Sequence, residues 1–209
     1  MKRPRLGQAT RTLIWRGQTE TPQQGRARIV LARRRFLSSK TREAFRDLFT
    51  REMKRLGKKL RNGRIIKYEP IGNSLGFWIL HKENWIGFLL ADVTAEKGRL
   101  EVSIETIQGE GHKNESDDFR AENKTHWNAA LAGLAVESAY WNGFDRIKLR
   151  RPETLDGYQK PYVGGGAIRP ATEAEADRIR ERMRQLYTRT RKECDFTKTE
   201  GNYWVREFP

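Results

Sequence analysis

This 209-residue sequence has one cysteine and no long apolar run, and its first third contains few acidic residues. Cys194 is the only cysteine, so no internal disulfide can form and nothing points to an oxidising compartment. The longest apolar runs, such as residues 85–91, are far too short to span a bilayer. The Arg-rich, acid-free start of the chain would fit a transit peptide, but it has no apolar core of signal-peptide length. We therefore expect a cytoplasmic protein with no membrane partner.

Metal ligands and reactive side chains are also scarce. The three histidines are scattered, and the spacing of His112 with Asp117 and Asp118 is typical of no particular metal site, so we predict none. Cys194 is followed by Asp195 near the end of a predicted helix. Both influences raise a thiol pKa, so we interpret this cysteine as structural rather than as a nucleophile.

The shortage of acidic residues leaves the start of the chain strongly basic. Residues 1–64 hold 20 Lys and Arg against 4 Asp and Glu, a net of +16, whereas residues 65–209 hold 22 against 23, a net of −1. Such a block usually meets a polyanion, so we predict contact with DNA or RNA, with a solvated arm as the alternative. The cations expected to contact phosphates are Arg33, Arg34, Arg35, Arg42, Arg46, Lys54, Arg55, Lys58 and Lys59.

We expect a flexible segment followed by a folded domain. Residues 1–26 are polar and contain Pro and Gly, which predicts a flexible basic arm before a domain at 27–209. Helical spacing of apolar residues follows Ser39, which fits an N-cap, and Gly63 is predicted to end that helix. A membrane-surface helix is the weaker interpretation, because its apolar face is narrow and lacks Trp. Strands are predicted at 29–31, 64–72, 77–81, 85–93 and 98–107.

The second half of the domain opens with a helix from about residue 125 that is apolar on most sides, which predicts burial. Gly143 fits its C-cap, and a strand at 144–150 follows, as in a crossover beside a sheet. The rest is predicted as a loop at 151–170, a helix opened by a Thr172/Glu175 capping box, and two short strands at 194–208. The order predicts an α/β (α+β) domain with a single mixed, mostly antiparallel sheet flanked by helices.

Three phrases in the same order resemble the GNAT acyltransferase superfamily. "HKENWIGFLLADV" is similar to its hairpin phrase, "ESAYWNGFDRIKLR" to its central helix and following strand, and "RQLYTRTRKECDFTKTEGNYWVREF" to its closing phrase. The resemblance covers residues 27–209 and implies a GNAT-like fold. It also implies transfer of an acyl group from acetyl-coenzyme A to an amine, with the cofactor bound where two strands splay apart.

The resemblance implies a cofactor loop with the pattern Gln/Arg-x-x-Gly-x-Gly/Ala, whose backbone N–H groups hold the pyrophosphate. "QGEGHKNESDD" supplies Gln108, Gly109 and Gly111, but Lys113 replaces the last small residue. The acidic residues that follow are interpreted as an inserted loop at the rim of an acceptor site, with the helix start displaced. The displaced start brings three further candidate phosphate contacts, the amides of Thr125 and His126 and the nearby Lys124.

The resemblance also implies an acid and a base. Tyr187 matches the tyrosine that reprotonates the departing thiolate, with a core tyrosine as the alternative. Glu105 and Glu101 are candidate bases on the strand before the loop, with a solvated strand face as the alternative, since they alternate with Leu100, Val102 and Ile104. The same two carboxylates with Lys113 would also suit a metal-dependent nuclease.

Two functions follow from these patterns. One is an N-acyltransferase using acetyl-CoA or a related acyl-CoA, associated with nucleic acid through its basic N-terminal third. The alternative is a non-catalytic DNA- or RNA-binding protein on an α/β scaffold, in which Trp and Tyr could stack on bases. A degenerate acyltransferase fold that has lost its cofactor belongs to this alternative.

Overall fold

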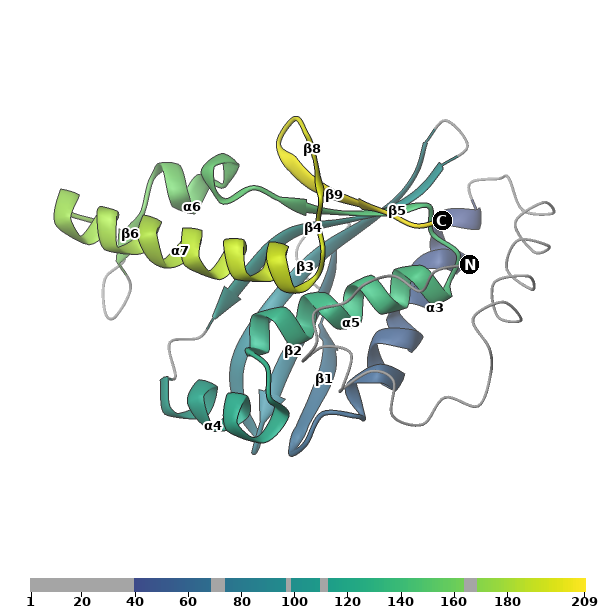
Figure 1. The fold of residues 1–209 in the computed structure, drawn as a ribbon, viewed down its shortest axis with the longest axis horizontal. Helices are drawn as coiled ribbons and strands as arrows, with labels where there is room; N and C mark the ends of the chain where they lie inside the picture. Colours follow the sequence, from purple (N-terminus) through teal and green to yellow (C-terminus); the bar gives the residue numbers. More distant parts are fainter. Residues whose placement is uncertain (1–39, 69–73, 97–98, 110–112, 164–168) are drawn as a thin grey trace.

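The computed structural model describes residues 40–68, 74–96, 99–109, 113–163 and 169–209 (Figure 1). The predicted arm at 1–26, the strand at 29–31 and the N-cap at Ser39 lie outside these residues. The same holds for Arg33, Arg34, Arg35 and Gly111, and for the side chain of Arg42.

The described residues form one seven-stranded sheet, together with helices and a separate two-stranded pairing. The sheet has the order β1-β2-β3-β4-β5-β9-β8, and every neighbouring pair is antiparallel except β4 and β5. The prediction of a mixed, mostly antiparallel sheet is therefore confirmed. Its strands are β1 (Gly63–Tyr68), β2 (Leu75–His81), β3 (Asn84–Glu96), β4 (Arg99–Gly109), β5 (Arg146–Arg150), β8 (Lys198–Glu200) and β9 (Tyr203–Glu207).

Helices cover the sheet face that carries Phe77. On that face Phe49 of α3 (Lys40–Gly57) meets Phe77 of β2 edge-to-face, with ring centroids 5.8 Å apart. Helix α5 (Trp127–Trp141) lies across the same face and is buried along nearly its whole length, as its apolar sides predicted. Helix α7 (Glu173–Glu193) runs beside α5 and projects past the sheet (Figure 1). Within the described part of the chain, no helix has the length and apolarity needed to cross a bilayer.

The first described helix ends earlier than predicted. It stops at Gly57, and Gly63 is the first residue of β1 instead of a helix end. A side chain at Gly57 would meet Ile65 at 2.4 Å, so the helix end requires glycine where it crosses the strand. Asn62 then turns the chain into β1 with a left-handed φ of 48°.

The β2–β3 hairpin is confirmed, with a tighter turn than predicted. Lys82 and Glu83 alone form the turn, with φ values of 47° and 66°, and Asn84 already belongs to β3. Two consecutive positive φ values are the geometry of a type I′ turn, whose twist matches that of the flanking strands.

The prediction that one face of β4 is wet was wrong. Glu101 is only 5% exposed and Ser103 is also buried. Strand β5 pairs with β4 at these residues, and it places Arg146 and Lys148 against the Glu101 carboxylate. The alternation of the sequence is real, but the polar side is covered by paired charges and not by water.

Two segments predicted as loops contain helix. The acidic stretch forms α4 (Lys113–Asn123), whose one fully buried apolar side chain, Phe119, packs edge-to-face on His81. Residues 151–170 hold a 3-10 turn (Pro152–Thr154), the short α6 (Asp156–Gln159) and the pair β6 (Tyr162–Val163) and β7 (Arg169–Pro170). The predicted capping box is confirmed: the backbone N–H and the hydroxyl of Thr172 both donate to Glu175, at 2.9 and 3.0 Å.

Candidate functional site

The parallel strands β4 and β5 part after four residue pairs. Their register runs from Glu101 opposite Arg146 to Ile104 opposite Leu149, whereas β4 continues to Gly109. Arg150 donates to the carbonyl of Thr154 at 3.0 Å, inside the 3-10 turn that takes the chain away from the sheet. The last five residues of β4 therefore have no described strand on their β5 side.

A cavity of about 740 Å³ lies at this open edge. Residues 106–109 of β4 form one side, the start of α5 another, and the middle of α7 a third, with Ser116 and Asp117 of α4 at the rim. Its volume falls in the range typical of small-molecule sites, and it combines apolar walls with a few polar groups.

Tyr187 crosses the opening between α7 and β4. Its hydroxyl accepts a hydrogen bond from the backbone N–H of Ile107 at 2.9 Å, and the ring is buried. Burial raises the pKa of Tyr187, so the hydroxyl keeps its proton at neutral pH. Because the oxygen accepts from Ile107, its own hydrogen remains available to a second partner. Tyr187 is thus both a core residue and part of the cavity wall.

The start of α5 is shaped by close packing. Trp127, the first helical residue, lies over β3 and β4, where a side chain at Gly87 would come within 2.4 Å of the indole and one at Gly109 within 2.8 Å. His126 is the N-cap residue, but no side chain among the described residues caps this turn. Asn128, in the same turn, donates to Thr190 of α7 at 2.8 Å. The uncapped N–H groups and positive dipole end of α5 therefore adjoin the cavity.

The charges around the cavity are uneven. Burial, together with the charges of Arg189 and Arg120, lowers the pKa of His126 to about 4, while Asp117 opposes them. The imidazole is therefore neutral at physiological pH. Arg182 and Arg189 line the cavity from α7, and neither makes an ion pair with a described residue. A neutral ring, two arginines and a helix start together favour an anionic group at this wall.

The sequence located part of this site. Three of the residues predicted as cofactor contacts, Gln108, Gly109 and His126, line the cavity. Lys124 and Thr125 do not line it: Lys124 is exposed with a left-handed φ of 57°, and the Thr125 hydroxyl donates to Glu193 at 3.2 Å. The prediction that the central helix starts near Thr125 is confirmed, because α5 begins at Trp127. The acidic stretch before it is not the predicted inserted loop but helix α4, which begins at Lys113.

The two candidate bases lie in different settings, and neither lines the cavity. Glu105 accepts a hydrogen bond from the Tyr203 hydroxyl at 3.1 Å and pairs with Arg150 at 3.4 Å, and it is the first residue of β4 beyond the pairing with β5. Burial tends to raise the pKa of Glu101, but hydrogen bonds from Lys148 and Arg146 outweigh burial and lower it. Glu101 is therefore held as a carboxylate in an ion-pair cluster within the paired part of β4.

The predicted phosphate contacts on α3 and just after it fall into two groups, exposed and half-buried. Lys54 and Lys58 are exposed, with no ion pair to any described residue. Arg55 pairs with Glu52, whereas Arg46 and Lys59 are half-buried. Burial lowers the pKa of Lys59, so this lysine is partly committed to the protein interior.

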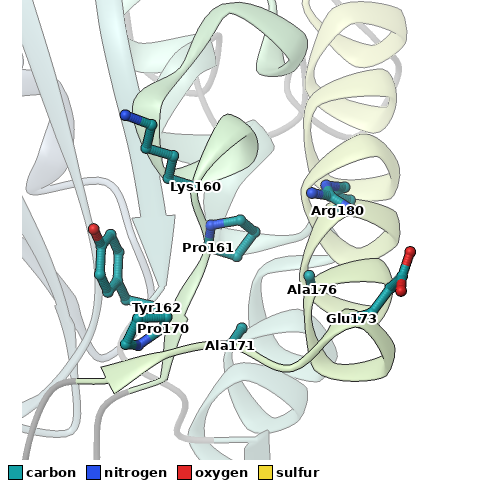
Figure 2. A pocket seen from close by; sticks show the side chains of 8 residues that line it. All are labelled: Lys160, Pro161, Tyr162, Pro170, Ala171, Glu173, Ala176 and Arg180. Carbon is teal, nitrogen blue, oxygen red and sulfur yellow. The ribbon is translucent and has the colours of Figure 1, made fainter.

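Other chemically reactive groups lie apart from the cavity. Cys194 is fully buried, and burial raises its pKa to about 12, which confirms the structural interpretation. No three potential metal-ligating side chains converge among the described residues. A second hollow of about 500 Å³ lies between residues 160–162 and the first turns of α7 (Figure 2). Its Arg180 is already engaged, donating to the Tyr158 carbonyl at 3.2 Å and to Asp177 at 3.1 Å.

Arg182 and Arg189 were missed by the sequence analysis, although a signal for them exists. Arg178, Arg182, Gln185 and Arg189 recur at helical spacing and form one ridge of α7, so their shared face could have been found. Comparison with known proteins adds nothing to this geometry, because no protein-family model matches the chain and no curated protein matches it in sequence.

Proposed function

We propose that this chain is an N-acyltransferase of the GNAT type, which binds acetyl-CoA or a related acyl-CoA in the cavity beside β4 and acylates an amine. The observation that carries the proposal is the parting of β4 and β5. It leaves a strand edge, a helix start and two arginines without described ion-pair partners around one cavity. The order of elements around that edge agrees with what the GNAT resemblance implies.

The residues present fit such a ligand. Arg182 and Arg189 would hold its phosphates, because guanidinium groups form paired hydrogen bonds with phosphate oxygens. The start of α5 and the neutral His126 ring would add N–H donors. Asp117 at the rim is the one nearby carboxylate, and it lies on the α4 side of the cavity.

When bound, an acyl-CoA would supply an acyl group activated as a thioester. Residues 106–109 of β4 line the cavity, and this open strand edge would orient the bound acyl group. Tyr187 holds a proton on a hydroxyl that already accepts from Ile107, and it would donate that proton to a departing thiolate. Glu105 is held by Tyr203 and Arg150 and does not line the cavity, so it would accept the proton lost by the amine through a water relay.

The basic first third of the chain would bring the enzyme to nucleic acid, or to an acceptor carried on it. Charge alone supports this part of the proposal, since residues 1–64 carry a net of +16. The exposed Lys54 and Lys58 also favour a second candidate function, a non-catalytic protein that binds nucleic acid with this same region.

Thermal unfolding of the full chain with and without acetyl-CoA tests the catalytic proposal first. At about 100 times the dissociation constant, a ligand adds about 2.7 kcal/mol to the stability. For a chain of this size that corresponds to about 5–10 °C. Acetyl-pantetheine, which has no phosphates, is the matched control and should give a much smaller shift. Absence of any shift at millimolar acetyl-CoA would contradict the proposal and favour the second candidate.

A further inference from the structure

Four aromatic side chains form a continuous patch on the sheet face away from α3 and α5. Trp78 is central, with ring centroids 4.8 Å from Phe88, 5.0 Å from Trp85 and 5.5 Å from Tyr68. We call these four residues the aromatic platform. Trp85 is 42% exposed and is one of two large hydrophobic side chains that stand out into solvent among the described residues.

The orientation of the platform follows from the alternation of side chains along β2. Phe77 and Ile79 are fully buried on the face that α3 covers, so Trp78 between them projects from the opposite face. Helix α4 also contacts the sheet from the covered side, through Phe119 and His81. None of the described helices packs on the platform, where Trp85 is exposed and the other three rings are partly exposed, and such a group of rings marks an interaction surface.

A band of positive charge leads to the platform. Residues 54–64 hold Lys54, Arg55, Lys58, Lys59, Arg61 and Arg64, with no acidic residue between them. The band enters the sheet at β1, where Arg64 lies opposite Leu80, and Leu80 lies opposite Trp85. Within the band, Arg64 pairs with Glu83 and Arg55 with Glu52, whereas Lys58 and Arg61 are exposed and make no ion pair with a described residue. A partner that matches both features carries planar rings on an anionic backbone.

We propose that the aromatic platform stacks the bases of a single-stranded nucleic acid, while residues 54–64 contact its phosphates. Single strands fit because their bases are free to lie on aromatic faces, whereas a duplex hides its base faces in its own stack. This inference rests on the nucleic-acid part of the proposed function and is independent of the acyl-transfer part.

The platform also adjoins the cavity. Phe88 lies opposite Gln108 in the β3–β4 register, and Leu90 lies opposite Thr106. Gln108 and Thr106 belong to the open edge of β4 that lines the cavity. A nucleic acid stacked on the platform would therefore lie one β-strand away from that edge.

The test measures binding of the full chain to a fluorescent oligo(dT) of about 12 nucleotides, a length within the range for such sites. Fluorescence anisotropy gives the affinity, and a duplex of equal length is the comparison. Trp85→Ala should weaken single-strand binding about tenfold or more, because one stacked base is lost. Trp85→Phe should restore most of it, and both variants should remain folded, as thermal unfolding checks, because Trp85 is 42% exposed.

The salt dependence of the binding affinity separates the contribution of base stacking from that of phosphate contacts. Replacing Lys58 and Arg61 together by Ala should reduce the slope of log affinity against log salt by about 0.7 per lost phosphate contact. Trp85→Ala should weaken binding at every salt concentration and leave that slope unchanged. Tyr162→Ala is the control, since Tyr162 is the other exposed aromatic side chain and lies at the cavity.

Each contrary outcome has a separate meaning. Unchanged binding by Trp85→Ala, or a preference for the duplex, would overturn the stacking proposal while leaving charge-driven association in place. Loss of binding in Tyr162→Ala but not in Trp85→Ala would also overturn it, by placing the nucleic acid at the cavity. Absence of binding to any strand would overturn it together with the nucleic-acid part of the proposed function. The acetyl-CoA thermal shift is measured without nucleic acid, so its result stands apart from all three.

Discussion

The hydroxyl of Tyr187 accepts the backbone N–H of Ile107 at 2.9 Å, on the side of β4 from which β5 has departed. A side chain on α7 thus supplies the acceptor that a neighbouring strand would have supplied. The contact holds α7 against the sheet and leaves the hydroxyl proton of Tyr187 available to another acceptor. The same hydrogen bond therefore stabilises the open edge and positions the proposed general acid.

Tyr187→Phe should therefore change two quantities. Removing the hydroxyl leaves a buried N–H without an acceptor, which should lower the free energy of unfolding by about 1–3 kcal/mol. Acyl transfer should fall by about 100-fold or more, the usual cost of losing a general acid. Urea unfolding and a transfer assay on the still-folded variant check the two effects separately. Full transfer activity in the variant would exclude the acid role.

Arg182→Ala and Arg189→Ala should each weaken acetyl-CoA binding about tenfold or more, the typical loss for a hydrogen bond to a charged partner. Arg178→Ala is the matched control, because it lies on the same ridge of α7 but does not line the cavity. Isothermal titration gives the three affinities. Equal affinity in all three variants would show that the arginines do not hold the ligand.

Gly87→Ala should disturb the packing at the start of α5. The new methyl group would lie 2.4 Å from the Trp127 ring, so the ring must move, at a cost of about 1–3 kcal/mol. Gly157→Ala is the control, since its added carbon meets nothing within 4 Å. Urea unfolding followed by tryptophan fluorescence should show a lower midpoint for the first variant only. A wild-type midpoint for Gly87→Ala would contradict the placement of the indole.

Glu137 should give the protein a pH-dependent stability. It is buried on α5, where its carboxylate accepts from the Trp141 indole at 2.6 Å and its other oxygen has no hydrogen-bond partner among the described residues. Burial raises the pKa of Glu137 to about 7. The folded state therefore holds a proton that the unfolded state releases near pH 4.5.

The sign of the Glu137 effect follows from this proton. Between pH 4.5 and 7 the folded state binds more protons, so the free energy of unfolding falls as pH rises, by about 3 kcal/mol in total. Glu137→Gln keeps an oxygen for Trp141 and removes the titration, so its advantage over the wild type should grow from pH 5 to pH 8. Urea unfolding of both proteins across this range measures the difference. Parallel pH curves for the two proteins would contradict it.

Local chemistry explains which elements the sequence predicted well. The β2–β3 hairpin, the capping box at Thr172 and Glu175, and the burial of α5 each depend on residues close together in the chain. Helix α4 was missed because its first turns are acidic and only Phe119 is fully buried, which leaves no apolar stripe to recognise.

The errors at the candidate site have a different cause. Glu101 was predicted to be wet because polar residues alternate with apolar ones along β4, yet the cations that cover it come from β5. In the sequence, Arg182 and Arg189 look like solvated arginines on any charged helix. Only the fold, which places the end of β4 opposite them, shows that they line a cavity. In both cases the environment of the side chain is set by a segment far away in the sequence, so no local pattern could predict it.

The short register between β4 and β5 also has a consequence for the order of assembly. Strands β1 to β4 form a meander whose contacts are local, and β5, β8 and β9 form a second group. Only four residue pairs join the groups within the sheet, and they require segments such as Glu101 and Arg146, 45 residues apart, to meet. Closing that long loop is entropically costly, so the seam should form late in folding and exchange its amide hydrogens early. The strand edge that borders the cavity is thus also the boundary between two folding units.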